Sequence, residues 1–231
     1  MRIVRLQRRA RIVDGRDVLS EILDHPGPTH TMFDVLAACV AALSPGPRVA
    51  MLGFAGGGVV APLRAMGFHA PLAAVDLSMQ GVRLFRELAG PWAGTVEVDQ
   101  ADAAAWLQRR TRRYDLIFED LSTTRSRGRL AVKPAVSIET LPALMQRRLR
   151  SNGVVVTNLL PMPKMRWEIL LQRLAAPFAH AQVVHLDGYV NRILLAGRQL
   201  PEARATSARL RAALARIGSN QTAAIHVRRL A

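Results

Sequence analysis

The chain has a single cysteine, Cys39, among its 231 residues. One thiol cannot form an intramolecular disulfide or a cysteine-rich metal site, so we expect Cys39 simply to pack inside a helix. The histidines also lack the spacing of metal ligands, and we predict no metal. Aromatic residues make up only 5% of the chain, and we expect the three tryptophans to lie in the core rather than to stack on bases.

Long apolar runs are also missing. No run approaches the roughly 18 residues that a membrane-spanning helix needs, and the first residues lack the apolar stretch of a secretory signal. We therefore expect a cytoplasmic protein. With 50% hydrophobic residues, the chain can bury the core of one domain that carries a small appendage.

Acidic residues and lysines are scarce. The chain has 17 acidic and 32 basic residues, of which only Lys133 and Lys164 are lysines, and its formal net charge is +15. The bias toward arginine is typical of a GC-rich genome, but that bias does not explain the shortage of acids. Basic residues gather in the ranges 2–16, 109–133 and 204–229. Solvated basic faces and a polyanion-binding surface are both open interpretations.

The most informative segment is residues 48–59, where a short apolar run breaks into four glycines within six positions. Glycines turn sharply, adopt positive φ and let a ligand approach the backbone amides. The pattern is typical of a strand that leads into a nucleotide-binding loop. The loop residues expected to bind the nucleotide are Gly53, Phe54, Ala55, Gly56, Gly57 and Gly58.

Apolar periodicity predicts alternating strands and helices along most of the chain. An Asp-Gly turn at 14–15 predicts a small N-terminal β-hairpin, and the helix at 32–43 follows a capping hydroxyl. Further helices are expected at 59–66, 79–88, 103–110, 141–149 and 165–176. Strands are expected from 49 onward and at 72–75, 95–98, 116–118, 153–159, 182–186 and 192–196.

The connections between the strands set the expected topology. Helical crossovers between the first five strands imply parallel pairing, whereas only about five residues join the last two strands, which must therefore be antiparallel. The expected fold is α/β, with a doubly wound, Rossmann-like, seven-stranded sheet whose last strand is antiparallel. We expect three parts, namely a β appendage at 1–28, the main domain at 29–200, and a basic helix and tail at 201–231.

Three consecutive strands are each followed by an acid: Asp76, Asp102 and Asp120, the last beside Glu119. Ligands of open α/β sheets bind outside the carboxyl ends of the strands, and an acid after the second strand accepts ribose hydroxyls. Asp76 and Asp102 are alternatively helix caps. Together with the glycine loop, the three acids favour a nucleoside site.

An acid after the third strand and a reversed final strand resemble the class I S-adenosylmethionine-dependent methyltransferase fold. Within it, residues from about 12 to 196 resemble the spermidine synthase family. The Tyr-His-Glu-Met helix start of that family is similar to residues 29–32, and its glycine-rich loop corresponds to 53–58. Its Gly-Asp-Gly adenine segment corresponds to 101–103, and its Tyr-Asp-hydrophobic-Asp-Ser-Ser-Asp segment to 114–123.

The resemblance implies a cofactor and a partner surface. The cofactor would be S-adenosylmethionine, its decarboxylated form or methylthioadenosine, and the family precedent leaves a homodimer open. Besides the loop, the resemblance assigns cofactor contacts to Asp76, Leu77, Asp102, Ala103 and Asp120.

Departures from the family argue against a polyamine acceptor. Aminopropyl transfer needs carboxylates that anchor two amines and one that acts as a base. Here the loop acid is replaced by Gly56 and the second gate acid by Thr123, so only Asp120, with Glu119 beside it, is left for catalysis. Segment 125–133 adds four positive charges near the acceptor mouth. The residues expected to contact the acceptor are His30, Arg125 and Arg127.

Three interpretations of the function follow. The first is methyl transfer to an anionic small molecule or a polyanion, because methyl transfer needs mostly alignment. In the second, aminopropyl transfer persists, with Glu119 and Asp120 supplying the missing acids. The third is a non-catalytic nucleoside-binding or nucleic-acid-binding protein that uses its arginine-rich tail.

Overall fold

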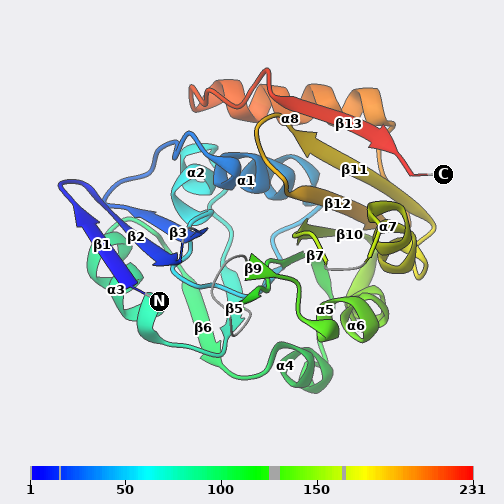
Figure 1. Ribbon diagram of the computed structural model, residues 1–231, viewed down its shortest axis with the longest axis horizontal. Coiled ribbons are helices and arrows are strands. Elements are labelled where there is room, and N and C mark those ends of the chain that lie inside the picture. Colours follow the sequence, from blue (N-terminus) through cyan, green and yellow to red (C-terminus); the bar gives the residue numbers. More distant parts are fainter. Residues whose placement is uncertain (1, 16, 125–130, 163–164, 231) are drawn as a thin grey trace.

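Figure 1 shows a computed structural model of the chain. The structure describes residues 2–15, 17–124, 131–162 and 165–230. Arg125 and Arg127, which we expected to contact the acceptor, lie outside the described residues.

Eight strands form one mixed sheet in the order β13-β11-β12-β10-β7-β4-β5-β6. The five strands from β10 to β6 pair in parallel, and β12, β11 and β13 continue the sheet in antiparallel pairs. These pairings confirm the doubly wound α/β fold and the antiparallel last strands. The bounds are β4 Val49–Leu52, β5 Leu72–Asp76, β6 Val96–Gln100, β7 Tyr114–Glu119, β10 Leu149–Leu159, β11 His180–Leu186, β12 Arg192–Gly197 and β13 Ile225–Arg229.

The main sheet has one strand more than the seven we predicted, because the tail adds β13 beside β11 at the edge. Of its five residues only Ile225 is buried, and the strand ends in Arg228 and Arg229. An edge strand is held by backbone hydrogen bonds along one side and one apolar anchor, so it needs little hydrophobic pattern. The basic sequence of β13 therefore lacks the apolar pattern from which a strand is predicted.

Helices cover both faces of the main sheet (Figure 1). One face carries α1 (Met32–Leu43), α2 (Val60–Ala65), α3 (Gln80–Ala89) and α8 (Ala203–Arg216). The other carries α4 (Ala103–Arg109), α5 (Ala135–Glu139), α6 (Leu141–Arg148) and α7 (Trp167–Ala175). Within the described residues, no helix combines the length and the apolar character that a membrane span requires.

Helix α1 forms as its sequence predicts. It begins where the Thr31 side chain accepts the N–H of Phe33, and the apolar residues behind this cap are buried. Cys39 lies inside the helix, where burial raises the pKa of its thiol. On the outer side, α8 packs against α1 with Leu210 and Leu214, one helical turn apart, fully buried.

The N-terminal part is a separate antiparallel sheet of three strands. Its strands are β1 (Arg2–Leu6), β2 (Arg9–Asp14) and β3 (Asp17–Leu23). The predicted hairpin is β2 with β3, whereas β1 gave no signal because its side chains are mostly exposed. Ile12 and Ile22 belong to the main apolar core, so the appendage and the large sheet share one core.

Candidate functional site

The carboxyl ends of the parallel strands meet at one edge of the main sheet, and the predicted site residues gather there. The N–H of Gly53, just past β4, donates to the carbonyl of Val75 in β5 at 2.9 Å. The N–H of Asp120, just past β7, donates to the carbonyl of Leu52 at 2.8 Å. The glycine loop therefore lies between the ends of β5 and β7.

The glycine loop uses the conformations that only glycine adopts freely. Gly53 and Gly57 have φ values of +88° and +68°, where a side chain is strained. A Cβ on Gly53 would lie 2.8 Å from the carbonyl oxygen of Asp120. Glycine at this position lets the loop pass directly beside the end of β7.

Asp76 fastens this loop to the end of β5. Its Oδ2 accepts the N–H groups of Phe54 and Ala55 at 2.8 and 2.7 Å, and its Oδ1 accepts the N–H of Ser78 at 2.8 Å. Ala55 takes a φ of +50° in this turn. Since a carboxylate offers about four acceptor positions and three are used here, one remains for a further donor.

The glycine loop packs closely against helix α3. The side chain of Phe54 is buried and meets the ring of Phe85 edge to face at 5.1 Å. Its N–H donates to Asp76 and its carbonyl accepts the N–H of Gly57, so both of its backbone polar groups are bonded within the protein. Helix α3 begins against the loop, because a Cβ on Gly81 would overlap the carbonyl oxygen of Ala55. The loop thus has little room to move toward α3.

Gly56 is the position where the resemblance would place an acid. A Cβ there would lie 2.7 Å from Cδ1 of Ile22 and 2.8 Å from Cδ1 of Ile12. Both isoleucines come from the N-terminal sheet. An aspartate at position 56 would have to displace them and would bury its charge among apolar groups.

The end of β6 forms the other side of the candidate site. Asp102 is exposed and caps α4, where its Oδ1 accepts the N–H of Ala105 at 2.9 Å, while Ala103 is buried as the first helical residue. Leu77 has an exposed fraction of 71%, the largest among the large apolar side chains of the described residues. An apolar side chain is thus presented to solvent directly after Asp76.

Asp120 belongs to a chain of side-chain hydrogen bonds. Asn158 Nδ2 donates to Asp120 Oδ1 at 2.6 Å, and Asn191 Nδ2 donates to Asn158 Oδ1 at 3.1 Å. We did not predict Asn158, although it lies at the carboxyl end of β10, where the strand-end rule would have found it. Asn191 precedes β12 in a short turn and carries no such signal.

The pKa of Asp120 is raised to about 6. Burial is the main cause, because it disfavours the charged form. The positive charge of Lys133 and the hydrogen bond from Asn158 oppose the shift, and the charge of Glu119 adds to it. Asp120 therefore changes protonation close to neutral pH.

Glu119 points away from the opening. It is fully buried, and Lys133 Nζ donates to both of its carboxylate oxygens at 2.8 Å. Ser137 Oγ and the N–H of Leu121 also donate to its Oε1, at 3.0 and 2.8 Å. This arrangement gives Glu119 a structural role and leaves Asp120 as the acid at the end of β7.

His30 lies just before α1, at the same edge as the site. Its side chain is exposed and its φ is +59°, an uncommon conformation for a residue other than glycine. Its N–H donates to Asp34 Oδ2 at 3.0 Å, and its carbonyl accepts from Gln221 Nε2 at 3.1 Å. The described residues contain no group of three His, Cys, Asp or Glu side chains that could hold a metal ion.

Solved structures share this fold. Human methyltransferase-like protein 13, in complex with SAH, has a TM-score of 0.62 and 20% identity, with 80% of this chain and 90% of that chain covered. The spermidine synthase from Thermotoga maritima has a TM-score of 0.59 and 15% identity, with 87% and 73% covered. A spermidine synthase in complex with the transition-state analogue AdoDATO has a TM-score of 0.57 and 14% identity, with 75% and 60% covered.

Neither a family model nor a curated protein sequence matches the chain. The structural likeness and the strand order together give this chain the class I methyltransferase fold in a spermidine synthase-like form.

Proposed function

We propose that this chain is an S-adenosylmethionine-dependent methyltransferase whose acceptor is not a polyamine. The observation that carries the proposal is Asp120, a carboxyl with a pKa of about 6, fixed by Asn158 at the end of β7 and beside Gly53. A group of this pKa at the carboxyl edge of such a sheet is suited to accept a proton at neutral pH.

The side chains at the edge fit an adenosyl group. Asp76 has an acceptor position left for the ribose hydroxyls, and Asp102 has a free oxygen for the adenine amine. The exposed Leu77 between them would be covered by the adenine ring. When bound, the cofactor supplies an electrophilic methyl group. Solved proteins of the same fold hold SAH and AdoDATO, which supports this choice of ligand.

Asp120 would act through its second oxygen. Oδ1 accepts the hydrogen bond from Asn158, which leaves Oδ2 to take the proton from the nucleophilic atom of the acceptor. Asn191 holds Asn158 in the orientation that donates to Asp120. The amide pair thus positions the carboxylate without adding a charge.

The geometry disfavours aminopropyl transfer. Isoleucines fill the space beside Gly56, where the acid for the amine of the donor would stand. Glu119, the alternative acid, is enclosed with Lys133. Of the acids that the sequence predicts for this site, only Asp120 is therefore left to bind an acceptor amine. An uncharged or anionic acceptor fits this site better. Contacts from His30, Arg125 and Arg127 to such an acceptor are part of the proposal and rest on the sequence.

Isothermal titration calorimetry tests the cofactor. We expect the wild type to bind S-adenosylmethionine more tightly than its decarboxylated form or methylthioadenosine. Leu77→Ala and Asp102→Asn each remove one contact with the cofactor and should each weaken binding about tenfold. A tenfold change in Kd corresponds to about 1.4 kcal/mol of binding free energy. Asparagine can still cap α4, so Asp102→Asn spares the helix.

Leu6→Ala removes an exposed leucine from β1, the outer strand of the N-terminal sheet, and serves as the control. A wild type that binds none of the three ligands would refute the proposal. Tighter binding of the decarboxylated donor would replace methyl transfer by aminopropyl transfer.

A further inference from the structure

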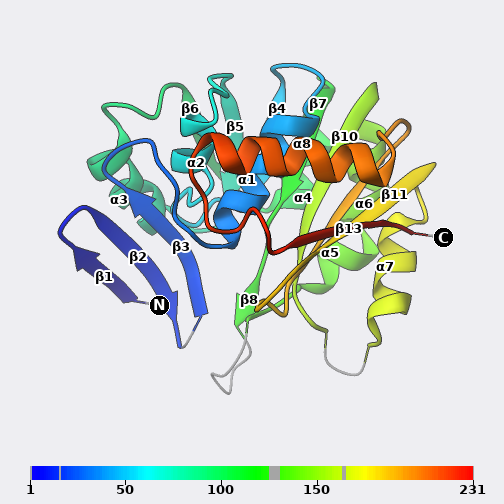
Figure 2. The same ribbon diagram turned by 90° about the horizontal axis from the view of Figure 1, so that it is seen from above.

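Arginines gather at the amino edge of the parallel strands, opposite the candidate site. They lie in the three connections that lead into β4, β7 and β10. Figure 2 shows the blue turn before β4 at this edge and β8 (Thr123–Thr124), which follows β7, at the opposite edge. The exposed arginines, which we call the basic edge, are Arg48, Arg109, Arg112, Arg113, Arg147 and Arg150.

The three connections touch one another, so the basic edge is continuous. The carbonyl of Arg48 accepts the N–H of Asp115 at 2.8 Å, which joins the β4 and β7 connections. Arg148 donates to the carbonyls of Leu107 and Gln108 at 3.1 and 2.7 Å, which joins the β10 connection to the end of α4.

Few acids balance this charge. Asp115 is buried and pairs with Arg150 at 3.2 Å, and Asp99 pairs with the half-buried Arg110. Within the part of the chain that the structure describes, the other five arginines of the basic edge form no ion pair with an acid. Their uncompensated charge repels itself and attracts a polyanion.

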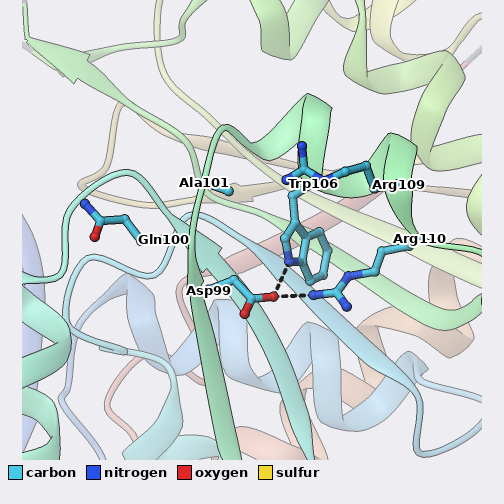
Figure 3. A pocket seen from close by; sticks show the side chains of 6 residues that line it. All are labelled: Asp99, Gln100, Ala101, Trp106, Arg109 and Arg110. Carbon is cyan, nitrogen blue, oxygen red and sulfur yellow. Dashed lines mark hydrogen bonds and ion pairs between the residues drawn. The ribbon is translucent and has the colours of Figure 1, made fainter.

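A hollow of about 340 Å³ adjoins the basic edge beside β6 (Figure 3). Trp106 Nε1 donates to Asp99 Oδ2 at 2.6 Å, and Arg110 donates to the same oxygen. The guanidinium of Arg110 lies over the Trp106 ring, 4.2 Å from its centre. These contacts fix a planar cation in the wall of the hollow. The lining residues are Asp99, Gln100, Ala101, Trp106, Arg109 and Arg110.

We propose that the basic edge and this hollow bind single-stranded nucleic acid. The arginines contact successive phosphates, and one unpaired base enters the hollow and stacks on the guanidinium of Arg110. Asp99 Oδ1 then accepts from an amino or imino group of that base. The arginines of the basic edge lie at the opposite end of the parallel strands from the candidate site, whereas the hollow is lined by Gln100 and Ala101, next to Asp102.

Two other assignments fit the structure less well. An anionic membrane surface would call for exposed apolar side chains that insert, and no large one is exposed on the basic edge among the described residues. The tail, which the sequence offered as the nucleic-acid surface, commits two of its arginines to backbone carbonyls of the fold. Arg211 donates to the carbonyl of Ile225 at 2.9 Å, and Arg216 donates to that of Met66 at 3.1 Å.

Fluorescence anisotropy with a labelled, mixed-sequence, 20-nucleotide single-stranded RNA tests the proposal between 50 and 200 mM salt. The variant Arg112→Glu/Arg113→Glu/Arg147→Glu should bind at least thirtyfold more weakly than the wild type at 100 mM salt. Each lost phosphate contact lowers the slope of log K against log salt by about 0.7, so the slope should fall by about 2.

The matched control is Arg83→Glu/Arg204→Glu/Arg209→Glu, which changes net charge equally at exposed positions on α3 and α8, outside the basic edge. We expect less than a threefold loss of affinity. Equal losses in both variants would overturn the proposal, because they would show a response to total charge only. Circular dichroism and thermal melting confirm that both variants are folded.

The hollow has its own test. Arg110→Ala should weaken binding of the single strand at least fivefold and leave binding of a 20-base-pair duplex unchanged. A wild type that binds the duplex as tightly as the single strand would overturn the assignment to unpaired bases. Binding to vesicles of anionic phospholipid without binding to RNA would overturn it as well.

Discussion

At the scale of single residues, the raised pKa of Asp120 predicts how stability depends on pH. Its carboxyl has a pKa of about 6 in the folded protein, against an ordinary value of 3.8, so it binds its proton more tightly in the folded state. The free energy of unfolding therefore decreases as the pH rises through this window. Asp120→Asn removes the penalty and keeps an oxygen for Asn158. The variant should be more stable than the wild type by about 3 kcal/mol at pH 8, and by less than half of that at pH 4.5.

Urea unfolding at the two pH values measures this difference. A second variant, Asn158→Leu, tests the hydrogen bond to Asp120. Loss of this bond should raise the pKa of Asp120 further and shift the pH dependence of activity to higher pH. An Asp120→Asn variant that is equally stabilised at both pH values would show that charge burial is not the cause.

Removing only one partner of the ion pair between Lys133 and Glu119 should strongly lower the free energy of unfolding. Both side chains are almost completely buried, at 2% and 0% exposure. Lys133→Met leaves the carboxylate of Glu119 buried without a counter-charge, which typically costs about 3–5 kcal/mol. Chemical denaturation should show this loss, and Lys133→Met/Glu119→Gln should recover at least half of it. Additive losses in the double variant would contradict the inferred coupling.

At the scale of secondary-structure elements, the start of α3 holds the glycine loop in place. Replacing an exposed helical glycine by alanine usually stabilises a helix by about 1 kcal/mol. At Gly81 we expect the opposite, since the new Cβ would overlap the carbonyl of Ala55 and push the loop away from Asp76. Gly81→Ala should lower the free energy of unfolding by about 2 kcal/mol, within the 1–3 kcal/mol usual for overpacking, and should weaken cofactor binding. Arg83→Ala, exposed on the same helix, should change neither quantity.

The elements that could be predicted from the sequence are those with a strong local pattern. The helix behind Thr31 and the strands before Asp76 and Asp120 have apolar runs that end in a polar residue, so their positions follow from nearby residues alone. β13 lacks that pattern, because its stability comes from backbone pairing with β11.

Contacts between distant residues were beyond such reasoning. Glu119 and Asp120 are adjacent in the sequence and look equivalent there. In the structure Glu119 forms a buried ion pair with Lys133, whereas Asp120 accepts from Asn158 at the candidate site. Only the packing of Lys133 and Asn158 around them distinguishes the two. The same holds for Asp34, which accepts from Ser219, a residue 185 positions away.

At the scale of the whole molecule, the C-terminal segment packs onto the rest of the fold, and we expect the stability of the fold to depend on it. Helix α8 covers α1, and β13 completes the sheet. Ser219 Oγ donates to the buried Asp34 Oδ2 at 2.6 Å, which links the tail to the start of α1 at the candidate site. The basic tail therefore acts as part of the core and not as a free arm.

Leu214→Ala tests this role of the tail. The side chain is fully buried between α8 and α1, so its truncation should cost about 2–5 kcal/mol. Arg209→Ala, on the exposed face of the same helix, should change stability by at most about 0.5 kcal/mol. Because α1 carries Asp34 and the residues next to His30, we also expect Leu214→Ala to weaken cofactor or acceptor binding before the protein unfolds. Thermal unfolding with and without S-adenosylmethionine measures both effects, and a tail that detaches independently would instead leave the main transition unchanged.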